Sequence, residues 1–91
     1  MPRPRQKKHI TTYPYVTYYK PQGVPLKDLS RVTITHEEWE ALRLKHKKNY
    51  NQIEAAHHMH ISQSTFQRIL SSAHKKIGNA IVHGRAIQIT T

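Results

Sequence analysis

Apolar residues recur at helical spacing through the second half of the chain. They are Phe66, Ile69, Leu70, Ala73 and Ile77. Steps of three and four residues place such side chains on one face of an α-helix. Ser62 precedes the run in the position of a helix N-cap, and Gly84 follows it where helices commonly end in a glycine. The pattern predicts a long helix over residues 63–83.

A shorter capped segment precedes this helix. Asn51 can act as an N-cap, and Glu54, three residues later, completes a capping box. The apolar surface of the segment is supplied by Ile53, Ala55, Ala56 and Met59. We therefore predict a helix over residues 52–59. His60 follows at a turn position that needs a positive φ, and His is among the non-glycine residues that enter this region more often.

A third capped segment and two alternating segments complete the pattern. Thr35 and Glu38 have capping-box spacing, which predicts a helix over about residues 36–47. Its buried face is predicted to contain Trp39, Leu42 and either Ala41 or Leu44. Alternation of apolar and polar residues predicts short strands near 32–34 and 85–90, the second pairing with the first or with another subunit. The predicted fold is mainly α, a helix-turn-helix bundle of three helices with short β-segments.

The first part of the chain is rich in Pro, Tyr and basic residues and has no helical pattern. Arg3 and Arg5, held extended by the neighbouring prolines, could enter a minor groove or follow phosphates. The alternative is a solvated, disordered tail. The tyrosines at 13–19 could stack on nucleobases, although such clusters more often cover a core. We divide the chain into an extended basic arm over residues 1–30 and a helix-turn-helix domain over residues 31–91.

The charge balance narrows the classes of partner. Lys and Arg outnumber Asp and Glu by 15 to 5, which gives a formal net charge of +10. The basic residues are spread along the chain, as expected for a protein that follows a phosphate backbone. A chain of 91 residues, 36% of them hydrophobic, forms only a marginal core, so we expect a homodimer. No apolar run approaches membrane length and no signal-peptide core is present, so we expect a cytoplasmic protein without membrane contact.

The polar face of the 63–83 helix is the candidate surface for reading DNA. The residues predicted to contact bases are Gln63, Ser64, Gln67 and Arg68. Gln pairs bidentately with adenine and Arg with guanine, and the first turns of a recognition helix present such side chains to base edges. The residues predicted to contact the DNA backbone are Asn51, Ser62, Ser71, Lys75, Lys47, Lys48, Arg3 and Arg5. The alternative interpretation is an ordinary solvated helix face.

The chain contains eight histidines but no cysteine, and the histidine spacing does not predict a metal site. His57 and His58 are consecutive, so on a helix their side chains point about 100° apart. No pair of histidines four residues apart on a helix has a nearby carboxylate to complete a set of ligands. The chain also lacks a glycine-rich phosphate loop, and four of its five carboxylates cap or decorate helices. We expect no metal, no cofactor, no catalytic residue and no enzymatic activity.

Several segments resemble one family of small prokaryotic proteins. They are MPRPR, VTYYKPQGVPL, EEWEALRLK, IEAAHHMHISQSTFQRILSSAHKKI and NAIVHGRAIQI. The resemblance is to domain-of-unknown-function family 134, described as predicted DNA-binding proteins, and it spans nearly the whole chain. The family's helix-turn-helix is similar to a promoter-reading domain of sigma factors. The resemblance implies groove-facing positions at Gln63, Ser64, Gln67 and Arg68 and a helix start near phosphate at Asn51. Members often carry a cysteine in the arm, which this chain lacks.

Together these features predict a sequence-specific double-stranded DNA-binding protein. We expect a transcriptional regulator that reads the major groove with the 63–83 helix. Two alternatives remain open. One is a sigma-like module that contacts RNA polymerase or another protein, and the other is an RNA-binding protein without base-specific DNA readout.

Overall fold

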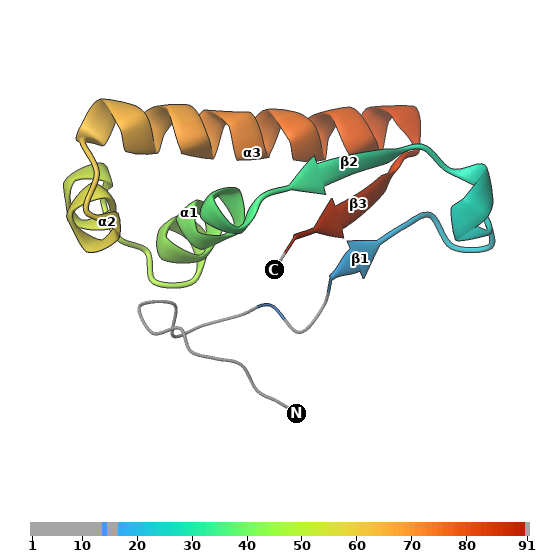
Figure 1. The fold of residues 1–91 in the computed structure, drawn as a ribbon, viewed down its shortest axis with the longest axis horizontal. Coiled ribbons are helices and arrows are strands. Elements are labelled where there is room, and N and C mark those ends of the chain that lie inside the picture. Colours follow the sequence, from blue (N-terminus) through green and yellow to red (C-terminus); the bar gives the residue numbers. More distant parts are fainter. Residues whose placement is uncertain (1–13, 15–16, 91) are drawn as a thin grey trace.

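The computed structural model describes residue 14 and residues 17–90, and these form three helices beside a small sheet (Figure 1). The helices are α1 (His36–His46), α2 (Gln52–Met59) and α3 (Gln63–His83), with a short 3-10 helix, η1, at Leu26–Asp28. The strands are β1 (Tyr18–Tyr19), β2 (Arg31–Ile34) and β3 (Ala86–Ile89). The predicted mainly α fold is confirmed, and α2 and α3 have the predicted boundaries. None of the described helices is both long enough and apolar enough to cross a membrane.

Side-chain caps explain why the helices begin where they do. Thr35 Oγ1 accepts the Glu38 N–H at 3.1 Å, and Glu38 Oε1 accepts the Thr35 N–H at 2.9 Å. The same reciprocal box joins Asn51 and Glu54 at the start of α2, at 2.8 and 3.1 Å. Ser62 Oγ caps α3 by accepting a main-chain N–H of the first turn at 3.1 Å. Each cap pairs amide donors that the helix itself leaves without acceptors.

The turn between α2 and α3 depends on the left-handed backbone of His60. This residue has φ 60° and ψ 41°, and its N–H donates to the carbonyl groups of Ala56 and His57. The predicted positive φ is therefore confirmed. The His60 side chain is exposed, so the backbone conformation, and not a side-chain contact, is what this position contributes to the fold.

Replacement of His60 by glycine is expected to leave stability unchanged or to raise it. Glycine adopts the left-handed conformation without a Cβ penalty, which offsets its greater freedom in the unfolded chain. The matched control is His57→Gly, an exposed α2 position inside the helix, where glycine should cost about 0.5 kcal/mol, the difference between the helix propensities of His and Gly. Thermal unfolding compares the two variants, and a marked loss of melting temperature in His60→Gly would contradict this account of the turn.

The principal core lies where the three helices meet. Its buried residues are Ala41, Leu44, Ala55, Ala56, Phe66 and Leu70. The prediction that Ile53 supplies apolar surface to α2 is wrong for the core, because Ile53 is 62% exposed. It lies two residues before Ala55, and a step of two residues turns a side chain about 200° around the helix.

The buried face of α1 also differs from the prediction. Ala41 and Leu44 are both completely buried, whereas Trp39 and Leu42 are only half-buried. The small Ala41 side chain allows α1 to pack closely, and the larger Trp39 and Leu42 instead line an open groove. Helical periodicity identifies the apolar side of a helix, but the neighbouring elements decide which part of that side is covered.

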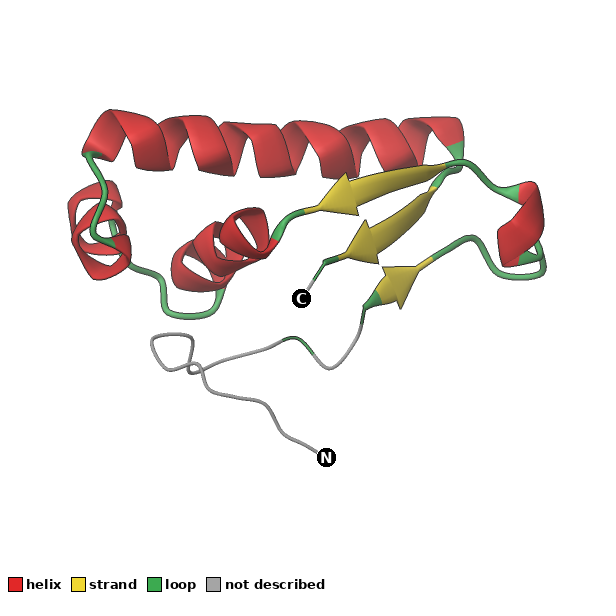
Figure 2. Cartoon of the chain, viewed as in Figure 1, coloured by secondary structure: helices red, strands yellow, loops and turns green. Residues whose placement is uncertain are grey.

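The sheet packs against the C-terminal half of α3 (Figure 2). Its strand order is β1-β3-β2, with β1 antiparallel and β2 parallel to β3. Ile34 lies opposite Ile89, and Arg31 opposite Ala86. A parallel pair needs a long crossover connection, and here α1, α2 and α3 together supply it. The predicted segment at 85–90 therefore pairs with the predicted segment at 32–34 within the same chain.

A polar network joins the start of α1 to the middle of α3. Glu38 is only 6% exposed. Its Oε2 accepts the Ser72 hydroxyl at 2.6 Å, and its Oε1 accepts Lys76 Nζ at 2.9 Å. Lys76 Nζ also donates to the carbonyl oxygen of Thr33 at 2.8 Å. The carboxylate that caps α1 thus also fixes α3 against the junction of β2 and α1.

Candidate nucleic-acid interface

The arrangement of α2 and α3 exposes one face of α3 near its N-terminus. In Figure 1, α3 lies across the view while α2 is seen almost end-on, so the two helices cross steeply. Ala55 and Ala56, with 0% and 2% exposure, have side chains small enough to bring the helices together. Phe66 and Leu70 turn into the core. The opposite side of α3 is left for solvent or a partner.

All four residues predicted to contact bases lie on this exposed side. Gln63, Ser64, Gln67 and Arg68 are exposed, as are the backbone-contact candidates Ser71 and Lys75. We call these six residues the α3 polar face. The structure thus brings the predicted residues of α3 together on one surface, as the 100° rotation per residue required.

The side-chain hydrogen bonds of the α3 polar face, to one another and to neighbouring residues, are all 3.3–3.4 Å long. Gln67 Nε2 lies 3.3 Å from Ser71 Oγ, and Arg68 Nη2 lies 3.4 Å from Thr65 Oγ1. Hydrogen bonds of this length are weak. A base edge or a phosphate that offered better geometry could therefore replace them at low cost.

The electrostatic character of α3 suits an anionic partner. The helix contains no acidic residue, and Arg68 and Lys75 both lie on its exposed side. Lys76, by contrast, turns inward to the Glu38 carboxylate. The positive end of the helix dipole at Gln63 adds to the field of the two exposed cations.

Two of the backbone-contact candidates act as helix caps. The Asn51 side-chain oxygen and main-chain N–H are both used in the capping box with Glu54. The Asn51 amide nitrogen is the side-chain group that can donate to a phosphate. Ser62 Oγ accepts the Thr65 N–H and donates to Thr65 Oγ1 at 2.8 Å, so its hydroxyl serves α3 first.

The other cationic candidates occupy different places. Lys48 is exposed between α1 and α2. Lys47 is the C-cap of α1 and lines the apolar groove beside that helix. Arg3 and Arg5 lie outside the described residues. The structure therefore gathers Ser71 and Lys75 with the predicted base-reading residues, but it places Lys47 on another surface.

Gln52 is a further candidate that the sequence did not single out. Its Nε2 donates to the main-chain oxygen of Gln63 at 3.3 Å, which links the first residue of α2 to the first residue of α3. Both side chains are exposed. In the sequence, Gln52 is only a polar residue that directly follows the N-cap of α2. Polar residues are common at this position, so nothing in the sequence singled it out.

A histidine pair also went unpredicted. His46 of α1 and His74 of α3 face each other with their Nε2 atoms 2.9 Å apart. Within residues 17–90, no three His, Asp or Glu side chains are close enough together to hold a metal ion. We interpret the pair as a contact between the two helices.

Comparison with known proteins identifies the relatives of this chain. The family model described as "Protein of unknown function DUF134" matches residues 1–91. A UPF0251 protein of Caldanaerobacter subterraneus subsp. tengcongensis is 46% identical over 89 residues, covering 98% of this chain and 75% of the relative. Similar proteins from Moorella thermoacetica and Dehalococcoides mccartyi strain 195 are 45% and 47% identical, each over 98% of this chain. The chain spans 60% of the Moorella protein and 76% of the Dehalococcoides protein. No solved structure matches.

Proposed function

This chain belongs to the family described as protein of unknown function DUF134, and the names of its relatives state no activity. We therefore propose a function from the exposed residues of the chain itself. The protein binds double-stranded DNA sequence-specifically, with α2, the turn and α3 acting as a helix-turn-helix. The first turns of α3 enter the major groove.

One observation carries the proposal. The α3 polar face combines two amides, two hydroxyl groups, an Arg and a Lys on the exposed side of an acid-free helix. Gln67 and Arg68 have the donor and acceptor groups that recognise adenine and guanine. Ser71 and Lys75 lie farther along the same face, where contacts to phosphate would set the position of the helix. An ordinary solvated face of a soluble helix usually includes carboxylates as well.

We further propose that the protein acts as a transcriptional regulator in the cytoplasm, without enzymatic activity. A single helix of this kind contacts only a few base pairs, and a homodimer on a two-fold symmetric site doubles the contacted sequence. RNA polymerase is a second proposed partner of a DNA-bound regulator.

The main alternative from another class is a sigma-like protein-interaction module whose charge attracts DNA only weakly. RNA binding without base-specific DNA readout is a further alternative. Salt dependence separates sequence-specific DNA binding from the interaction module. Sequence-specific binding survives physiological salt at selected sites, whereas a purely electrostatic attraction falls steeply as salt increases.

Substitution of Arg68 by alanine is expected to weaken binding to the preferred site by about 1–3 kcal/mol and to relax the preference at one base pair. Lys75→Ala is expected to weaken binding to all duplexes by a similar factor, because a phosphate contact carries no sequence information. Both affinities can be measured by fluorescence anisotropy with the selected duplex and with single-base variants.

The control is Lys45→Ala, which removes an exposed cation from α1 and leaves the α3 polar face intact. Its affinity should stay close to that of the wild type. Equal losses on every duplex for Arg68→Ala would show that Arg68 does not read a base. A preference for single-stranded RNA over every duplex would support the RNA-binding alternative instead.

A further inference from the structure

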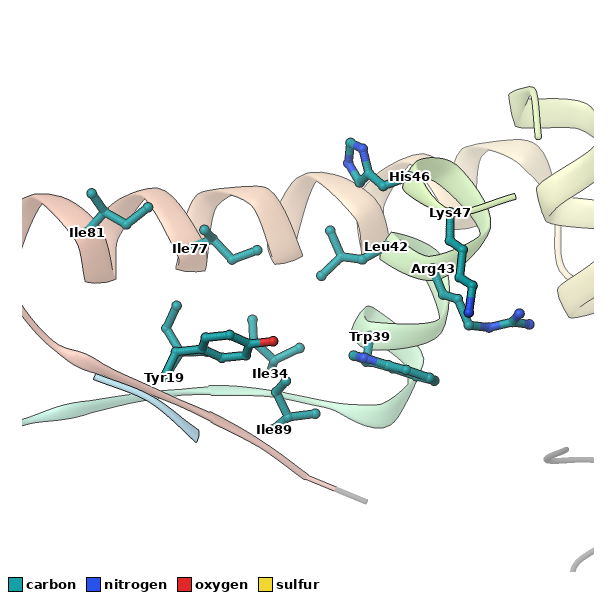
Figure 3. Close-up of a pocket in the computed structure, with 11 residues that line it drawn as sticks. Tyr19, Ile34, Trp39, Leu42, Arg43, His46, Lys47, Ile77, Ile81 and Ile89 are labelled. Carbon is teal, nitrogen blue, oxygen red and sulfur yellow. The ribbon is translucent and has the colours of Figure 1, made fainter. Parts of the chain in front are cut away.

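An apolar groove runs between α3 and the sheet and is closed at one end by α1 (Figure 3). Ile77 and Ile81 line it from α3, Ile87 and Ile89 from β3, and Trp39 from α1. Its volume is about 670 Å³, which falls within the usual range of small-molecule sites. Ile81 is 73% exposed, so one wall of the groove is a large apolar side chain that the described residues leave in water.

The α1 end of the groove is cationic. Arg43, His46 and Lys47 all line it there, and none of the described lining residues is acidic. Figure 3 shows Arg43 and Lys47 extending in the same direction beside Trp39. Arg43 is held by a bidentate bond to Glu40, at 2.7 and 3.0 Å. Lys47 is exposed and has no carboxylate within ion-pair distance among the described residues.

We propose that this groove binds an amphiphilic carboxylate, with its alkyl chain between α3 and the sheet and its carboxylate beside Lys47 at the α1 end. The alkyl chain covers Ile77, Ile81 and Ile87, which removes their side chains from water. The carboxylate is the complement of an unpaired ammonium group at the closed end. The site lies apart from the α3 polar face and does not depend on DNA binding.

The charges favour this occupant over a second copy of the chain. A two-fold contact that joined the α1 ends of two copies would bring their Lys47 ammonium groups together, with no acidic lining residue beside them. Arg43 adds little to this repulsion because it is already paired with Glu40. Like charges in such a contact disfavour association. A groove closed by α1 also suits a ligand with one polar end better than a helix that must run through it, since a helix with side chains is about 10–12 Å wide.

The single Trp of the chain provides a direct measurement, because Trp39 lies in the groove. The full chain is titrated with decanoate below its micelle concentration, and Trp39 fluorescence is recorded. Decanol and decyltrimethylammonium serve as the neutral and cationic probes with the same alkyl chain. We expect a saturable change with decanoate, weaker binding of decanol and the weakest binding of the cation.

Two matched pairs of variants locate the site. Lys47→Gln is expected to weaken decanoate binding about two- to fivefold, the size of an exposed charge interaction, and to leave decanol binding unchanged. Lys45→Gln, on the same helix but outside the groove, should change the binding of neither probe.

Ile81→Ser is expected to weaken the binding of both decanoate and decanol about tenfold through lost apolar contact. Val82→Ser, at a neighbouring position that is 79% exposed and outside the groove lining, should change neither.

Three results would overturn the proposal. One is the absence of a saturable change with decanoate. Another is equal binding of all three probes, which would indicate adsorption to exposed apolar surface only. The third is a Trp39 signal that depends on protein concentration, together with a dimer in sedimentation equilibrium that Ile81→Ser dissociates. That result would assign the groove to a second copy of the chain.

Discussion

Replacement of Phe66 by alanine is expected to destabilise the protein by about 3–5 kcal/mol. Phe66 is 1% exposed and is the largest fully buried side chain among the described residues, at the point where all three helices meet. Small domains have a total stability of about 5–15 kcal/mol, and a chain of this size has a small core, so this single change should remove a large fraction of the free energy of unfolding. Urea unfolding followed by circular dichroism measures the change.

The control for this prediction is Ile53→Ala on α2. Ile53 is 62% exposed, so its truncation should change stability by no more than about 0.5 kcal/mol. A loss below about 1 kcal/mol for Phe66→Ala would contradict the three-helix core, since deletion of a buried aromatic ring cannot be so inexpensive in a packed interior.

Replacement of Glu38 by alanine is expected to cost about 2–3 kcal/mol, because hydrogen bonds to a charged group are lost and partners are left unsatisfied. The change removes the acceptor of Ser72 and Lys76 and half of the capping box with Thr35. The charge of Lys76 contributes little beyond these hydrogen bonds, because its side chain is 35% exposed and water screens it. Glu37→Ala, at the exposed neighbouring position, is the control and should be nearly neutral.

The same network predicts how stability depends on pH. Burial opposes ionisation of Glu38, but the hydrogen bonds from Ser72, Lys76 and the Thr35 amide outweigh it and lower the pKa of Glu38 below its usual 4.5. A lowered folded-state pKa stabilises the protein above the unfolded value, and that contribution is lost as the pH falls through the folded value. The wild type should therefore be more stable than Glu38→Gln near neutrality. The difference should close only below about pH 4.5, and a constant difference down to strongly acidic pH would contradict the assignment.

Local chemistry made much of the fold predictable. Asn51, Ser62 and Thr35 mark helix starts because their side chains satisfy main-chain donors within three residues. The left-handed backbone of His60 was also predictable from its sequence neighbours, because a helix that ends in a tight turn commonly has a left-handed residue directly after it. Such features depend on sequence neighbours, and the structure confirms them.

Features that depend on distant residues were predicted less well. Ile53 looked like a core residue because it is apolar and helical, but α3 covers the other side of α2. Glu38 looked only like a cap, and nothing in its neighbourhood indicated that Ser72 and Lys76 would bury it. The groove at Trp39 also requires α1, α3 and the sheet to be placed relative to one another. Periodicity contains none of this information.

The candidate site falls between these two cases. The exposure of Gln67 and Arg68 followed from helical geometry alone, because the apolar side of α3 had to turn inward. The position of Lys47 in the groove could not be predicted from helical geometry, because it depends on how the C-terminal end of α1 packs beside α3 and the sheet. The surface that α3 presents could therefore be predicted from the sequence, whereas the surrounding cations could not.

Selection of bound duplexes from a random pool tests the central proposal most directly. The wild-type protein and Arg68→Ala are each used at physiological salt, where non-specific attraction is weak. We predict that the wild type enriches a short motif repeated in inverted orientation about 10 base pairs apart. Arg68→Ala should lose the preference at one G·C position of that motif. Failure of the wild type to enrich any motif would contradict sequence-specific DNA reading by α3.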